Sequence, residues 1–96
     1  MSPKNKIKLN LLRKKLDNLD YHLLKIIKKR TKIVKKVLIL KTYKNEIIDK
    51  KRISAILKKI KKESFKRNID PKITHRIWKN MIWSYINFEK KNFKKK

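Results

Sequence analysis

Cysteine and glycine are absent from this 96-residue sequence, which also has only two prolines, two histidines and seven acidic residues. Without cysteine the chain has no disulfide framework, no thiolate nucleophile and no Cys-based metal site. Without glycine it has no Gly-rich loop of the kind that cradles phosphates. Two histidines without clustered carboxylates argue against a metal site, and no Ser/His/Asp arrangement stands out. We therefore expect no metal and no covalent catalysis.

Long apolar runs are also absent. No stretch reaches the ~18 consecutive apolar residues typical of a membrane-spanning helix, and residues 1–10 lack the apolar run of a signal peptide. We therefore expect a soluble, cytoplasmic protein without a membrane partner. The length suits one domain of about three helices, which we assign to residues 1–96 and expect to be ordered over about residues 7–93.

Acidic residues are so few that the formal net charge is +25. A charge of this size ordinarily indicates nucleic acid or an anionic membrane as a partner. Here, however, the basic residues are spread over the whole chain, and 27 of the 32 are lysines, accompanied by abundant Ile and Asn. Because these amino acids have A/T-rich codons, a genome that drifts toward A and T would enrich them whatever the function of the protein. We therefore give the five arginines more weight than the lysines and expect no specific nucleic-acid partner.

One long helix is the dominant predicted element. Between Leu9 and Leu40, residues with alternating spacings of three and four form the apolar seam of a helix that packs on partner helices. The seam consists of Leu9, Leu12, Leu16, Leu19, Leu23, Ile26, Arg30, Ile33, Val37 and Leu40. We predict that the helix runs from about Ile7 to Thr42. Its residues 9–40 alone would be about 48 Å long, which is too long for a 96-residue monomer to bury by itself.

Arg30 interrupts this apolar seam. A guanidinium cannot lose its charge, so it needs a buried anion or a route to water. Either the side chain turns outward or pairs with a carboxylate, or its counter-charge belongs to a ligand. Lys41 lies about 20° around the helix and about 16 Å further along it, so the two cations could converge on one small anion. Arg13, about 25 Å from Arg30 and about 100° around the helix, could reach that anion only from another subunit.

A loop and a second helix are predicted next. The loop covers Tyr43–Ile48, and Asp49 is a suitable N-cap for a helix over residues 49–66. Asn68 can end this helix in the left-handed conformation that glycine would otherwise supply.

The third predicted helix begins with Asp70-Pro71, a cap followed by proline at the first helical position, and extends to about Phe93. One stripe of this helix consists of Trp78, Ile82, Tyr85 and Glu89. Glu89 has two readings. Either it faces a desolvated site, which would raise its pKa and favour the protonated form, or it meets a lysine in water near the helix end.

Several segments, in this order and spacing, resemble the all-helical (AroQ-type) chorismate mutases. They are Leu12–Asp20, Leu23-Leu24, Arg30, Lys41, Asp49-x-x-Arg52 and Asp70-Pro71. The likeness covers about residues 9–92. It implies an all-α fold whose three helices (one long, two shorter) form an intertwined homodimeric helical bundle. It also implies an isomerase without a cofactor, which converts chorismate to prephenate in the shikimate pathway, toward phenylalanine and tyrosine.

The resemblance also implies roles for particular residues. The implied substrate-binding set is Arg13, Arg30, Lys41, Asp49, Arg52, Tyr85 and Glu89. Arg30 would hold a carboxylate of the dicarboxylate substrate, and Lys41 would bind a carboxylate and the ether oxygen of the breaking bond. Arg13 would enter from the partner subunit, in agreement with the helix geometry above. Glu89 matches a Gln or Glu that contacts the same ether oxygen, and it must be protonated to donate. The implied catalytic residues are therefore Lys41, Glu89 and Arg30.

Two positions depart from the usual pattern of this family. After Arg52 many members have a Glu that meets the substrate hydroxyl, whereas this chain has Ile53. Tyr85 replaces a Ser that many members have. Both changes resemble the branch that includes isochorismate–pyruvate lyase, so that activity is an alternative. A basic helical protein that binds nucleic acid is a more distant alternative, because it leaves Arg30 in the seam unexplained.

Overall fold

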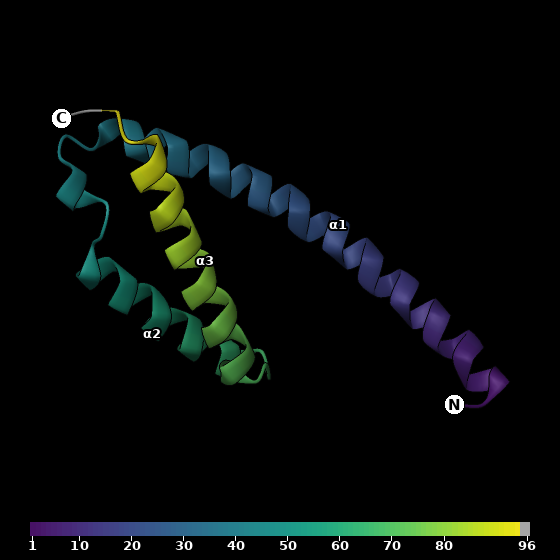
Figure 1. Cartoon of the computed structure of the whole chain (residues 1–96). Helices are drawn as coiled ribbons and strands as arrows, with labels where there is room; N and C mark the ends of the chain where they lie inside the picture. Colours follow the sequence, from purple (N-terminus) through teal and green to yellow (C-terminus); the bar gives the residue numbers. More distant parts are fainter. Residues whose placement is uncertain (95–96) are drawn as a thin grey trace. The chain divides into compact units, whose positions relative to one another are not determined.

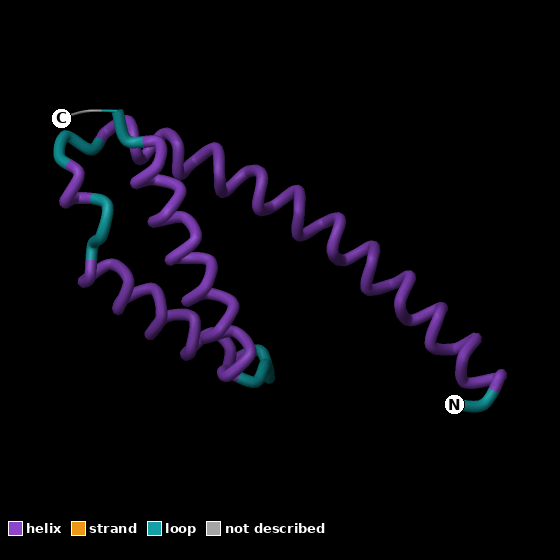
Figure 2. The backbone as a smooth tube through the Cα atoms, viewed as in Figure 1, coloured by secondary structure: helices purple, strands orange, loops and turns teal. Residues whose placement is uncertain are grey.

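The computed structural model describes residues 1–94, which form helices and loops and contain no strand. The elements are α1 (Pro3–Leu40), the short 3-10 helix η1 (Lys44–Glu46), α2 (Lys50–Lys66) and α3 (Pro71–Asn92) (Figures 1 and 2). The prediction of an all-α chain with one long and two shorter helices is confirmed. The intertwined dimer remains a prediction. Of the tail expected to be disordered after Phe93, residues 95–96 lie outside the described residues.

The chain divides into two units, Met1–Ile33 and Val34–Lys96, with the boundary inside α1. Within α1 only Leu38 is buried. The seam positions that are exposed in the first unit are Leu12, Leu16, Leu19, Leu23, Ile26, Arg30 and Ile33. A continuous apolar stripe of this length is unusual on the surface of a monomer, and it agrees with the expectation that one chain does not bury this helix.

The start of α1 differs from the prediction. The helix begins at Pro3 rather than at about Ile7. Ser2 acts as the cap: its Oγ accepts a hydrogen bond from the backbone N–H of Asn5 at 3.2 Å, and its carbonyl accepts one from Lys6 at 2.9 Å. Ser followed by Pro is a start signal, because serine satisfies a free N–H and proline needs none at the first helical position. The predicted start of this helix was therefore four residues too late.

The end of α1 is set by a glutamate in the following segment. The helix ends at Leu40 rather than Thr42, because Glu46 Oε1 accepts hydrogen bonds from the backbone N–H groups of Thr42 and Tyr43 at 3.3 and 2.9 Å. These bonds hold the chain in a turn that η1 continues. The segment predicted as a loop therefore contains one helical turn.

The predicted boundaries of α2 and α3 agree with the structure. Asp49 Oδ1 accepts a hydrogen bond from the N–H of Arg52 at 3.0 Å and caps α2. Asp70 caps α3 in the same way, ahead of Pro71 at the first helical turn. Asn68 has a φ of 57°, so the left-handed residue after α2 is confirmed.

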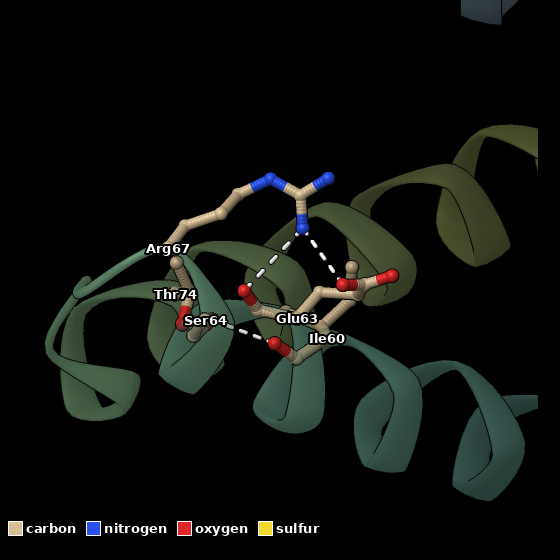
Figure 3. Close-up of polar contacts among 5 residues, drawn as sticks. All are labelled: Ile60, Glu63, Ser64, Arg67 and Thr74. Atoms are coloured by element: carbon tan, nitrogen blue, oxygen red, sulfur yellow. Dashed lines mark hydrogen bonds and ion pairs between the residues drawn. The ribbon is translucent and has the colours of Figure 1, made fainter.

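A pair of buried hydroxyl groups joins α2 to α3 (Figure 3). The side chains of Ser64 and Thr74 lie 2.7 Å apart, and Ser64 also donates to the carbonyl of Ile60 at 2.6 Å. On the exposed side of α2, Arg67 forms an ion pair with Glu63 at 2.8 Å. This guanidinium holds the pKa of Glu63 below its ordinary value, first by the hydrogen bond and then by its charge. Together, the hydroxyl contact and the short turn at Asn68 fix the α2–α3 hairpin.

The apolar core of the second unit is small and lies near the ends of its helices. Leu38, Ile47 and Ile86 are its buried members, and the half-buried side chains packed against them are Ile48, Ile53, Ile82 and Phe93. These residues come from α1, the η1 segment, α2 and α3. The core therefore brings the segment after α1 close to the C-terminal part of α3.

Candidate functional site

An ion pair between Lys41 and Glu89 is the central feature of the candidate site. Lys41 Nζ lies 3.2 Å from Oε1 and 3.1 Å from Oε2 of Glu89, so the ammonium donates to both carboxylate oxygens. Lys41 directly follows α1, and Glu89 lies in the last turns of α3, 48 residues further along the chain. The core formed by Leu38 and Ile86 fixes this contact, because each of these residues is three positions before a member of the pair.

The pair is largely removed from water. The side chain of Glu89 is 8% exposed and that of Lys41 is 18% exposed. Both oxygens of the buried carboxyl group thus have the same ammonium group as their partner. The sequence allowed two interpretations of Glu89, a desolvated site or a contact with a lysine in water. The structure combines parts of both, because Glu89 is buried and its partner is a lysine.

An open hollow of about 550 Å³ lies beside this pair. Its lining consists of Lys41, Glu46, Ile48, Asp49, Lys50 and Lys51. The structure therefore places two more acids and two more lysines around Lys41. Glu46 and Asp49 are already engaged with the backbone, where they end α1 and cap α2. Of the three lysines that line the hollow, Lys41 is paired with Glu89, whereas Lys50 and Lys51 form no ion pair among the described residues.

The other predicted site residues have different surroundings. Arg52 is exposed on the first turn of α2, and Tyr85 is half-buried on α3, one turn before Glu89. Arg13 and Arg30 lie on α1 within Met1–Ile33 and are exposed in the single chain. The structure thus brings Lys41 and Glu89 together and puts Asp49 at the same hollow. The substrate roles of all seven residues remain predictions.

Sequence reasoning missed Glu46 in this hollow and, in the α2–α3 hairpin, the contact between Ser64 and Thr74. Glu46 lines the hollow and turns the chain after α1, and its position three residues after Tyr43 is the spacing of a capping glutamate. Ser64 and Thr74 are buried and bonded to each other. Ser64 lies on the apolar face of α2 by helical spacing, but no sequence signal identified its partner.

The described residues therefore form an all-helical protein with a largely buried Lys41–Glu89 pair beside a hollow lined by lysines and acids. The model of the chorismate mutase type II family matches residues 12–90, and the chain belongs to this family. All seven predicted site residues lie within the matched range. No curated protein and no solved structure matches the chain.

No three or more His, Asp or Glu side chains converge in residues 1–94 in a way that could hold a metal ion. None of the helices in this range is long and apolar enough to cross a membrane.

Proposed function

We propose that the protein is a chorismate mutase, which converts chorismate to prephenate by an intramolecular [3,3] rearrangement in the cytoplasm, as a step toward phenylalanine and tyrosine. The observation that carries the proposal is the buried contact between Lys41 and Glu89 in a chain of the chorismate mutase type II family. This reaction needs no cofactor and no covalent intermediate. It needs a site that holds the reactive conformer and stabilises the charge that develops in it.

Lys41 would provide most of this stabilisation. Its ammonium group is held by Glu89 and is only 18% exposed on the side chain, so it is already oriented and partly desolvated before the substrate arrives. A preorganised cation in such a place interacts more strongly with developing charge than one in water. Lys41 would bind the ether oxygen as the carbon–oxygen bond breaks, more strongly in the transition state than in the ground state.

Glu89 would act as a second donor to the same ether oxygen. As an ionised partner of Lys41 it can only accept hydrogen bonds, whereas in the protonated form it can donate one. We therefore propose that the productive complex contains protonated Glu89, and that Glu89 and Lys41 both donate to the ether oxygen.

Arg30 and Arg13 would hold the carboxylates of the substrate. In this proposal Arg30 acts within its own chain, and Arg13 enters the site from the other subunit of an intertwined homodimer. The exposed seam of α1 supports such a dimer, because its leucines and isoleucines need a partner surface.

Mixing two inactive variants tests the shared site. A heterodimer of Arg13→Ala and Lys41→Met chains contains one intact site and one doubly altered site. Random pairing of equal amounts should therefore restore about a quarter of the wild-type activity, since half of the dimers are mixed. Absence of any restored activity in confirmed heterodimers would contradict the trans role of Arg13.

Isochorismate–pyruvate lyase activity is the second candidate. It is favoured by Ile53 and Tyr85, which replace the polar residues expected at those positions and leave a less polar site. Separate incubation with chorismate and with isochorismate decides between the two: prephenate from the first supports the mutase, and salicylate with pyruvate from the second supports the lyase. Turnover of neither, with salt-sensitive binding of RNA or DNA, would instead favour the nucleic-acid-binding alternative.

A further inference from the structure

A second hollow on the α2–α3 hairpin carries positive charge without compensation. We call it the basic groove; it has a volume of about 360 Å³ and is lined by Leu57, Lys61, Pro71, Lys72, His75 and Arg76. None of these six residues belongs to the predicted substrate-binding set. Leu57 and Pro71 are half-buried, while the four basic side chains are exposed around them. The hollow therefore has an apolar floor and a basic rim.

The absence of acids distinguishes the basic groove from the hollows at Lys41 and at Arg67. The hollow at Lys41 also contains Glu46 and Asp49, and the one at Arg67 contains Glu63. No acid lines the basic groove, and within residues 1–94 no carboxylate pairs with its four basic side chains. The nearest acid in sequence, Asp70, is occupied with the N–H of Lys72 at 2.9 Å.

An adjoining hollow extends the apolar floor. Leu57, Lys61 and His75 line both spaces, and the second space, of about 510 Å³, adds Ile48, Ile53 and Trp83 together with further lysines. A ligand lying across both hollows would meet basic side chains in each of them, and apolar side chains along its body. Pockets of this type, apolar with a few convergent polar groups, are typical small-molecule sites.

We propose that the basic groove is a second anion-binding site, which takes a small organic anion carrying its charge on an aromatic ring. The negative group meets Lys61, Lys72, His75 and Arg76, and the ring lies on Leu57. Cations that crowd one hollow repel each other, so a bound anion relieves this repulsion in addition to forming its own contacts. Inorganic phosphate has the charge but not the apolar body, and it should therefore bind more weakly.

Backbone amide NMR of the full-length protein, titrated with phenyl phosphate, benzoate and inorganic phosphate, tests this site without requiring turnover. Phenyl phosphate and benzoate should cause saturable shifts centred on residues 57–61 and 71–76. Inorganic phosphate should bind the same residues about tenfold more weakly, because it cannot bury a ring. The double substitution Lys61→Gln with Arg76→Gln should weaken phenyl phosphate about tenfold or more, through loss of charged hydrogen bonds.

The matched control is Lys66→Gln with Lys79→Gln, which removes the same two charges from exposed positions on the same two helices outside the groove. It should leave the affinity within about twofold of the wild type, since neither lysine lines the groove and salt weakens the effect of exposed charges that do not touch the ligand. Equal weakening by both pairs would overturn the proposal, as would shifts spread evenly over the lysines or confined to the surroundings of Lys41 and Glu89. Inorganic phosphate binding as tightly as phenyl phosphate would overturn the role of the apolar floor.

Discussion

Replacing Lys41 by methionine is the most informative single change, because it removes the charge while keeping most of the side-chain volume. If the ammonium stabilises the ether oxygen, the loss of this one donor should lower kcat by about 10²–10³. That factor corresponds to about 3–4 kcal/mol of transition-state stabilisation. Conversion of chorismate by the purified variant measures it directly.

The same substitution should also lower the stability of the fold. Surface ion pairs contribute about 0–1 kcal/mol, whereas removing one partner of a buried pair costs about 3–5 kcal/mol. Since the side chains of Glu89 and Lys41 are 8% and 18% exposed, we expect Lys41→Met to lower the free energy of unfolding by about 2–4 kcal/mol. Urea denaturation provides this value.

A double variant separates catalysis from stability. Adding Glu89→Leu to Lys41→Met removes both charges, so it should recover much of the lost stability while activity remains lost. Lys51→Met is the matched control, because Lys51 lines the same hollow but is not part of the pair; it should keep activity within about threefold, as expected for an exposed charge. Normal turnover in a folded Lys41→Met variant would refute the catalytic assignment.

Three further predictions concern other contacts. Glu89→Gln should keep most of the activity, because an amide can donate a hydrogen bond to the ether oxygen; a loss of turnover as large as that of Lys41→Met would contradict the donor role. Ser64→Ala should lower the free energy of unfolding by about 1–3 kcal/mol, since it leaves a buried hydroxyl on α3 without its partner, while the exposed Ser54→Ala on the same helix should have little effect in the same urea titration. Glu63→Gln should lower the Tm slightly at neutral pH and not in acid: Arg67 holds the pKa of Glu63 below its ordinary 4.5, so the stabilisation is present above 4.5 and disappears as the pH falls through the lowered pKa. A Tm difference that persists in acid would show that the ion pair between Glu63 and Arg67 is not its cause.

Local signals explain why much of the architecture could be predicted. Helices are capped or ended at Asp49, Asn68 and Asp70 by hydrogen bonds and backbone conformations that involve only a few neighbouring residues. Short segments of sequence are therefore enough to predict these boundaries. The same kind of signal at Ser2 was overlooked, which placed the start of α1 four residues too late.

By itself, the sequence determined the helices, their caps and the family, because these depend on periodicity and on local or ordered residue patterns. The tertiary structure alone decided that Glu89 is buried against Lys41 and that Ser64 meets Thr74. Each of these contacts joins residues from different segments of the chain. The sequence around each side chain is compatible with either a buried or an exposed position. The packing of Leu38 against Ile86 and the turn at Asn68 select one environment for each side chain. Once a polar group is buried in this way it can no longer bond to water, so it must find its partner within the protein.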